Sequence, residues 1–163
     1  MDEKPVTFKQ NPNVDYLFGY FGNMPVPTKQ DGYKPIEAIG IDEDGKETVL
    51  KNVFLRKPDT ASVKKFKQAI KDLISEKFTD EKRIKHPNPV QVSISVSITK
   101  KRFFDVDVDN LAKTVLDSLN EIAFDDDNQV TSLIVDKHIH PMNVNGILIA
   151  ITDLTKNKGL QCG

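Results

Sequence analysis

The sequence of 163 residues contains a single cysteine, Cys162, so no disulfide can form within the chain. It has no tryptophan, and no apolar run approaches the ~20 residues that a membrane-spanning helix needs. The first residues, Met-Asp-Glu-Lys-Pro, lack the basic-then-apolar order of a signal peptide. These absences, with a length that suits one domain, predict a single-domain cytoplasmic protein without a membrane segment.

The chain also lacks a strong overall charge, since its net charge is −1. The distribution is uneven: residues 100–137 carry five basic and nine acidic side chains, whereas residues 64–85 carry eight basic and four acidic ones. An acidic focus on a mildly basic body is typical of metal-dependent enzymes that act on phosphates. A solvated surface with one acidic loop would give the same numbers.

The periodicity of the apolar residues predicts an α+β fold with a mixed β-sheet and two main amphipathic helices. Residues 35–55 have the pattern of a hairpin with a turn at Asp42-Glu43-Asp44-Gly45. Helices are predicted at 60–78 and 110–123. Strands are predicted at 90–98, 129–139 and 147–154, and a further strand could start at 6–8. Strict alternation of apolar residues with Ser, Thr and Gln makes the strand at 90–98 the strongest of these signals.

The domain is expected to span residues 1–155, with the hairpin as an insertion within residues 20–55. Residues 156–163 are expected to form a disordered tail. Near the N-terminus, four aromatic residues could pack as a core cluster or stack on nucleic-acid bases, and the core is the better-supported interpretation. They are Tyr16, Phe18, Tyr20 and Phe21.

The stretch from Phe103 to Val130 carries the candidate chemistry. It opens with Asp105, Asp107 and Asp109, continues with a helical segment, and closes with the acidic run 125–127. We expect the two acidic clusters to converge at one end of this helix, where they would hold a divalent metal on a phosphodiester. Asp105 could replace Asp107 as a ligand if the preceding strand ends early.

Carboxylates suit this chemistry because Mg²⁺ prefers hard oxygen ligands and keeps several waters, so two to four acids suffice. A bound divalent metal neutralises phosphate charge, activates water and helps an alkoxide leave. Lys113, about one helical turn after Asp109, could bond a phosphate oxygen.

Other metal and phosphate sites do not fit the sequence. An EF-hand loop begun at Asp105 would need Gly at Asn110 and Glu at Leu116. No cysteine or acid pair accompanies His86, His138 and His140 at zinc spacing. No Gly-rich phosphate loop of the Walker type and no Ser or Cys nucleophile motif is present.

The central stretch resembles the signature of the RusA family of Holliday junction resolvases. The matching segments are Asp107-Val-Asp109-Asn110-Leu111-Ala-Lys113, then Asp117-Ser-Leu119, then Asp126-Asp127-Asn-Gln129-Val130. The resemblance implies a small α+β, Mg²⁺-dependent homodimeric endonuclease that cuts four-way DNA junctions in recombination and repair, with Mn²⁺ able to substitute.

Carried over to this sequence, the resemblance implies that Asp107, Asp109, Asp126 and Asp127 bind the metal. The catalytic set would be Asp107, Asp109, Asp127 and Lys113. Candidate DNA contacts are Lys100, Lys101, Arg102, Asn110 and Lys137. Two other functions stay open: a nuclease for other branched DNA, and a non-catalytic module whose acids bind a cation or a basic partner.

Overall fold

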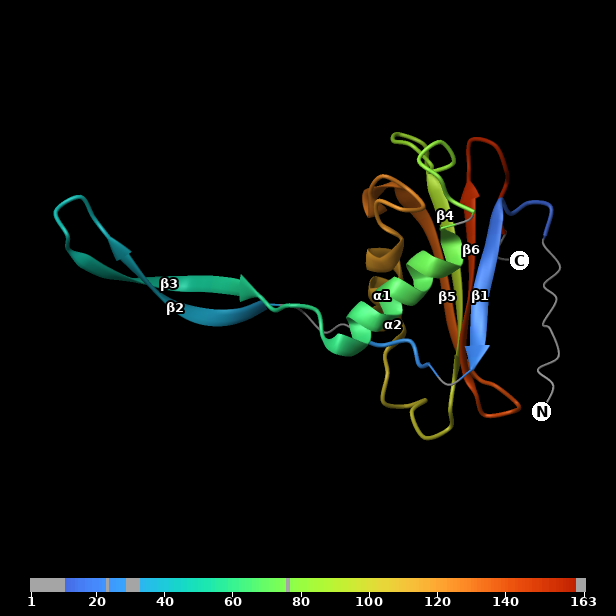
Figure 1. Ribbon diagram of the computed structural model, residues 1–163, viewed down its shortest axis with the longest axis horizontal. Coiled ribbons are helices and arrows are strands. Elements are labelled where there is room, and N and C mark those ends of the chain that lie inside the picture. The colour runs from blue at the N-terminus through green and yellow to red at the C-terminus, as the bar shows by residue number, and fades with distance from the viewer. Residues whose placement is uncertain (1–10, 23, 29–32, 76, 161–163) are drawn as a thin grey trace.

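The computed structural model describes residues 11–22, 24–28, 33–75 and 77–160. A four-stranded sheet in the order β1-β6-β4-β5 forms the body of the protein, and a two-stranded hairpin, β2-β3, extends away from it (Figure 1). In chain order the elements are β1 (Tyr16–Gly22), β2 (Tyr33–Ile41), β3 (Glu47–Arg56), α1 (Ala61–Ile74), β4 (Val90–Ile98), α2 (Val108–Leu119), the 3-10 helix η1 (Asp127–Gln129), β5 (Val130–Ile139) and β6 (Asn145–Asp153). The strand expected at residues 6–8 lies outside the described residues.

Strand β4 is the centre of the sheet and of the core. It pairs antiparallel with β6 and parallel with β5, which confirms the mixed sheet. Its apolar residues are all 0% exposed: Val90, Val92, Ile94, Val96 and Ile98. A parallel pair needs a crossover connection, and the segment that contains α2 provides it between β4 and β5.

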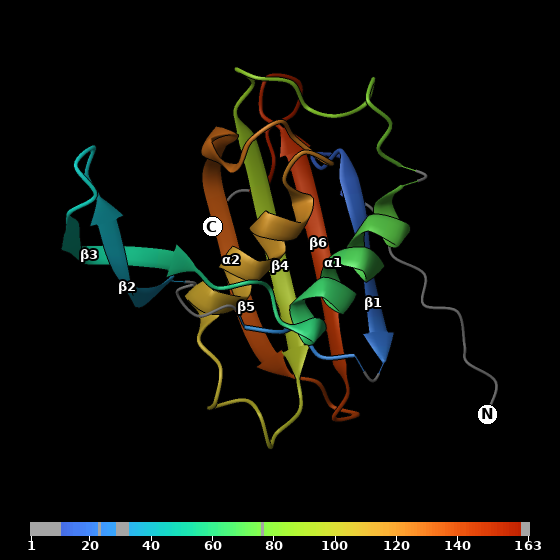
Figure 2. The same ribbon diagram turned by 60° about the vertical axis from the view of Figure 1, so that its left-hand side comes forward.

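Both long helices lie on one face of the sheet (Figure 2). Helix α1 buries Val63, Phe66, Ile70 and Ile74 at helical spacing, and α2 buries Leu111, Ala112, Val115 and Leu119. All of these side chains except Val63 join the apolar residues of β4 and β6 in one hydrophobic core. The α+β fold with two amphipathic helices is therefore confirmed.

Helix α2 is shorter than the sequence pattern predicts. It ends at Leu119 because Asn120 leaves the helical conformation, with ψ at 137°, and Glu121 takes a positive φ of 62°. Ile122 and Ala123 keep helix-like bonds, since both of their N–H groups donate to the carbonyl of Leu119. The apolar periodicity thus continued past the end of the helix into a tight turn.

The aromatic residues near the N-terminus lie on β1, a strand that the sequence pattern did not predict. Phe18 is buried, and Tyr16 and Tyr20 pack against the core, which confirms the core interpretation for these three. Phe21, at the end of the strand, is 38% exposed. A Cβ on Gly19 would lie 2.0 Å from the carbonyl oxygen of Ile147 on β6, so the two backbones approach more closely than any other residue would allow.

The hairpin at 35–55 is confirmed, and its turn is organised by Asp42. The carboxylate of Asp42 accepts the backbone N–H groups of Asp44 and Lys46, and Gly45 takes a φ of 78°. Among the side chains that the structure describes, none from β2 or β3 belongs to the core or packs against it. Several large apolar side chains of the hairpin are exposed: Ile39, Ile41, Val49, Leu50, Phe54 and Leu55.

The expected disordered tail is wrong for residues 156–160. The side chain of Gln91 donates to the carbonyl of Leu160 and accepts its N–H, and Gly159 donates its N–H to the carbonyl of Asn13. These backbone bonds fix the segment against β4 and the start of the chain. Residues 161–163 lie outside the described residues.

Candidate active site

The first acidic cluster lies on the loop between β4 and α2 and on the first turn of α2. Asp107 is the N-cap residue of the helix: its carbonyl accepts the N–H of Leu111, but its side chain makes no capping hydrogen bond. Asp109 lies in the first turn, where the positive end of the helix dipole favours a carboxylate. Both residues are exposed. Two carboxylates at the start of one helix could contribute to a single cation site.

Asp105 lies two residues before the N-cap, in the turn that closes with a bond from its N–H to the carbonyl of Arg102. Its carboxylate helps to keep Arg102 protonated: burial lowers the pKa of that guanidinium, and the charge of Asp105 opposes this. The N-cap residue of α2 is Asp107, whereas Asp105 interacts electrostatically with the guanidinium of Arg102.

Lys137 on β5 holds this loop in place. Its Nζ donates to the carbonyl of Phe103 at 2.8 Å and to the carbonyl of Val106 at 2.6 Å, and it lies 4.7 Å from the centre of the Phe103 ring. These bonds fix the backbone directly before Asp107. Lys137 was predicted to contact DNA, and its ammonium is engaged here within the chain.

The remaining basic candidates differ in exposure. Lys100 and Lys101 are exposed on the same loop, where a phosphate could reach them. Arg102 is half-buried and donates from Nη2 to the carbonyl of Val26 at 2.7 Å. Asn110 is half-buried in the first turn of α2, and Lys113 is exposed one turn further along. The DNA contacts therefore stay a prediction, with Lys100 and Lys101 the most accessible.

The second acidic run has separate structural roles for its first two members. Asp125 accepts the N–H of His86 at 3.0 Å and pairs with Arg83 at 2.9 Å. Asp126 caps η1: its carboxylate accepts the N–H of Asn128, and its own N–H donates to the side chain of Gln129. Such a reciprocal capping box fixes the turn that presents the next residue, Asp127.

Gln129, the glutamine near the end of the signature, has a structural role. It is buried, and its Nε2 donates to the carbonyls of Ile84 and Asn88. The same side chain therefore closes the cap on Asp126 and ties η1 to the segment before β4.

Asp127 is exposed but lies in an acidic environment. Its pKa is raised first by burial and then by a hydrogen bond and the charge of Asp126, with a further contribution from Asp117. Repulsion of this kind is relieved by a bound cation. Asp117 occupies a position of the family signature, although the sequence pattern alone assigns it no role.

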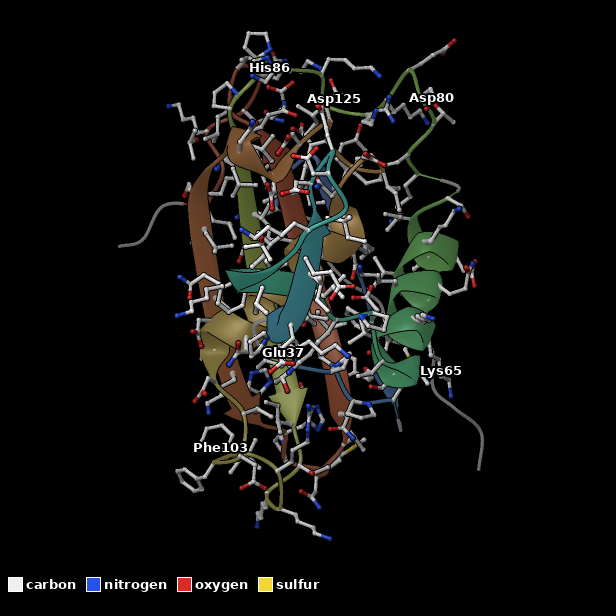
Figure 3. All side chains as sticks on the ribbon, turned by 90° about the vertical axis from the view of Figure 1, so that its left-hand side faces the viewer. Glu37, Lys65, Asp80, His86, Phe103 and Asp125 are labelled. Atoms are coloured by element: carbon white, nitrogen blue, oxygen red, sulfur yellow. The ribbon has the colours of Figure 1, made fainter. Side chains whose placement is uncertain are left out.

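The two acidic clusters lie at opposite ends of the molecule. Figure 3 shows Phe103, on the loop before Asp107, at the lower end of the sheet, and Asp125 at the upper end. Helix α2, with its 12 residues, separates them by about 18 Å at 1.5 Å per residue. Within the described residues no group of three or more His, Cys, Asp or Glu side chains is placed to hold a metal. The expected convergence of both clusters in one chain is therefore wrong.

The α+β fold, the carboxylates at the start of α2 and the exposed lysines beside them are features that a small metal-dependent nuclease domain would need. A family model described as Endodeoxyribonuclease RusA matches residues 46–152. The chain belongs to this family, whose resolvases cut Holliday junctions and depend on divalent metals. No curated protein matches the chain. Within the described residues, no helix is long and apolar enough to cross a membrane.

Proposed function

We propose that this protein is a Mg²⁺-dependent, structure-selective endonuclease that resolves four-way DNA junctions in the cytoplasm by paired phosphodiester hydrolysis, in recombination or repair. The observation that carries the proposal is the pair of exposed carboxylates, Asp107 and Asp109, at the start of α2. They lie within the segment matched by the family model and follow a loop that Lys137 anchors.

The donor groups fit a hard divalent cation. Carboxylate oxygens are the ligands that Mg²⁺ prefers, and the raised pKa of Asp127 indicates negative charge that a cation would neutralise. Asp107, Asp109, Asp126 and Asp127 would hold the ion, which when bound lowers the pKa of a water and neutralises phosphate charge. Mn²⁺ has similar ligand preferences and could substitute. Lys113 would donate to a phosphate oxygen and stabilise the charge that develops there.

A homodimer would complete the site that one chain leaves divided. A two-fold axis across α2 would run the helices of the two copies antiparallel, so that the start of one helix lies beside the end of the other. Asp107 and Asp109 of one copy would then approach the partner's Asp126 and Asp127. Two such composite sites, related by symmetry, would suit the symmetric strands of a junction.

Cleavage of a synthetic four-way junction in Mg²⁺, beside a linear duplex, tests the activity. We expect paired nicks in the junction, loss of cleavage in Asp107→Asn, and retained cleavage in the matched control Asp105→Asn. Asp107→Asn should still bind the junction and should lose most of the thermal stabilisation that Mg²⁺ gives. Equal cleavage by wild type and Asp107→Asn would refute the site. Faster cleavage of flaps or forks would move the substrate to other branched DNA. Stabilisation by Mg²⁺ without turnover on any DNA would favour a non-catalytic binding module.

Mixing two inactive variants tests the composite site. In a dimer of Asp107→Asn with Asp127→Asn, one composite site carries both substitutions and the other carries neither. The mixture should therefore recover single nicks, whereas each variant alone should be inactive. Sites contained within one chain would give no recovery, because each chain of the mixed dimer would carry one defect.

A further inference from the structure

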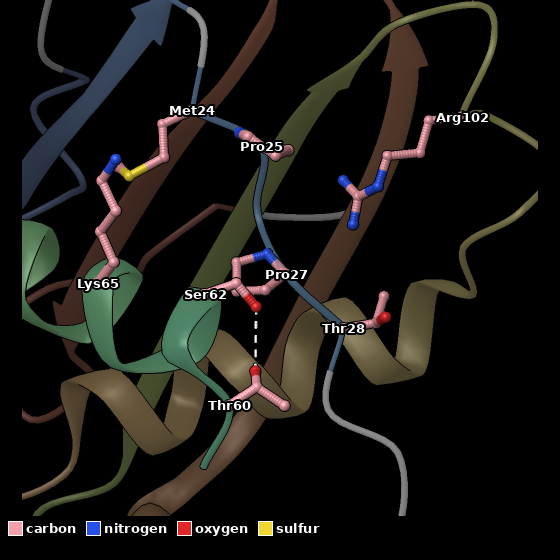
Figure 4. Close-up of a pocket in the computed structure, with 8 residues that line it drawn as sticks. All are labelled: Met24, Pro25, Pro27, Thr28, Thr60, Ser62, Lys65 and Arg102. Atoms are coloured by element: carbon pink, nitrogen blue, oxygen red, sulfur yellow. Dashed lines mark hydrogen bonds between the residues drawn. The ribbon is translucent and has the colours of Figure 1, made fainter.

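A cavity of about 640 Å³ opens between the start of α1, residues 24–28 and the loop after β4 (Figure 4). Its walls combine two proline residues of the 24–28 segment with polar and charged side chains. The residues that matter for its chemistry are Thr28, Thr60, Ser62, Lys65 and Arg102.

The lining of this cavity suits an anion. Lys65 and Arg102 line it together with three hydroxyl-bearing residues, and none of its lining residues in the described part of the chain is acidic. Asp59, the acid next to Thr60 in the sequence, forms a 2.7 Å ion pair with Lys67. A volume of this size admits a phosphate group together with its water.

Arg102 is fixed at the cavity wall. Its Nη2 donates to the carbonyl of Val26 at 2.7 Å, which holds the guanidinium beside residues 24–28. Burial lowers the pKa of the guanidinium, and the charge of Asp105 raises it. The guanidinium therefore places a fixed positive charge at one wall of the cavity.

The N-terminus of α1 also favours an anion in the cavity. Thr60 caps this helix of 14 residues, and its hydroxyl bonds that of Ser62 at 3.0 Å (Figure 4). The positive end of the helix dipole therefore lies at the cavity wall. Either hydroxyl can turn its proton toward an acceptor, because a hydroxyl both donates and accepts.

The cavity lies at the same end of the sheet as the first acidic cluster. In Figure 3, Lys65 and Phe103 lie toward the lower end, whereas His86 and Asp125 lie at the upper end. Arg102 precedes Asp107 by five residues on the same loop. A DNA strand with a phosphate in the cavity would thus pass close to the carboxylates at the start of α2.

We propose that this cavity binds a backbone phosphate of the DNA strand that enters the site at Asp107. The proposal rests on the proposed nuclease function and names the part of the substrate that the cavity takes. Contacts to phosphates position the strand without reading its sequence, as a junction-selective enzyme requires.

The test compares Lys65→Gln with Lys64→Gln, an exposed lysine of the same helix that does not line this cavity. Binding of a labelled four-way junction is followed by fluorescence anisotropy in EDTA from low to moderate salt. Each lost phosphate contact lowers the slope of log affinity against log salt by about 0.9. We expect this decrease in Lys65→Gln, on junction and duplex alike, and no change in Lys64→Gln.

Two further variants guard against a loss of fold. Ser62→Ala removes a hydroxyl from the cavity wall and should weaken junction binding without lowering the melting temperature. Arg102→Lys keeps the charge but loses the paired donors, so it should weaken binding while Lys64→Arg does not. Inorganic phosphate should compete with the junction less effectively in Lys65→Gln than in wild type.

The outcomes separate the cavity from the nuclease. Unchanged salt slopes in Lys65→Gln, with normal junction binding, would overturn the phosphate site and leave the nuclease standing. Cleavage lost in Asp107→Asn together with a lowered slope in Lys65→Gln would support both. No DNA binding by wild type would overturn both together.

Discussion

Replacing Lys137 by Met tests whether this lysine positions the loop before Asp107 or contacts DNA. Its Nζ makes two bonds to backbone carbonyls and lies over the Phe103 ring. Hydrogen bonds of charged groups contribute about 1.5–3 kcal/mol each, and the cation–π contact about 0.5–1 kcal/mol. Water can solvate part of what the substitution exposes, so we expect a net loss of roughly 2–4 kcal/mol in the free energy of unfolding.

For a chain of this length that loss corresponds to a decrease of about 5–12 °C in Tm, measured by circular dichroism. Lys101→Met is the matched control, because Lys101 is exposed on the same loop and should leave Tm unchanged. Cleavage by Lys137→Met should fall because the backbone before Asp107 is released, while the salt dependence of junction binding stays as in wild type. An unchanged Tm with a lower salt slope would refute the positioning role and show a phosphate contact instead.

Three other perturbations test the fold. Replacing residues 34–55 by a short flexible linker should shift the melting temperature of the body little, because no described side chain of this segment belongs to the core; a large decrease would show that the hairpin stabilises the body. Gly19→Ala should cost more than about 2 kcal/mol in urea unfolding, since its Cβ would meet a backbone oxygen at 2.0 Å, whereas Gly40→Ala, with only side-chain contacts at 3.6 Å, should be nearly neutral. Burial raises the pKa of Asp153, but hydrogen bonds from Thr155 and Asn88 outweigh this effect, so the net pKa is lowered. Wild type should therefore have a higher free energy of unfolding than Asp153→Asn above about pH 4. This difference should disappear as the pH falls through the lowered pKa. Unfolding curves that stay parallel from pH 6 to pH 2 would contradict this assignment.

Local patterns in the sequence were sufficient for most of the fold. The alternation at 90–98 predicted β4 because one face of a buried strand must be apolar. The helical spacing of Phe66 and its neighbours predicted α1, and the turn at Asp42–Gly45 predicted the hairpin. Strand β1 escaped prediction because its seven residues include two glycines and consecutive aromatics, which leave no clear alternation.

The sequence by itself determined which acidic residues are candidates for the chemistry, since the signature and its spacing lie in one short segment, residues 107–130. Only the tertiary structure decided where they lie. A rigid helix of 12 residues carries the chain about 18 Å along its axis, so the acids that follow α2 begin far from those that precede it. The cavity beside Arg102 likewise exists only because three distant segments pack together, and no local pattern records such an encounter.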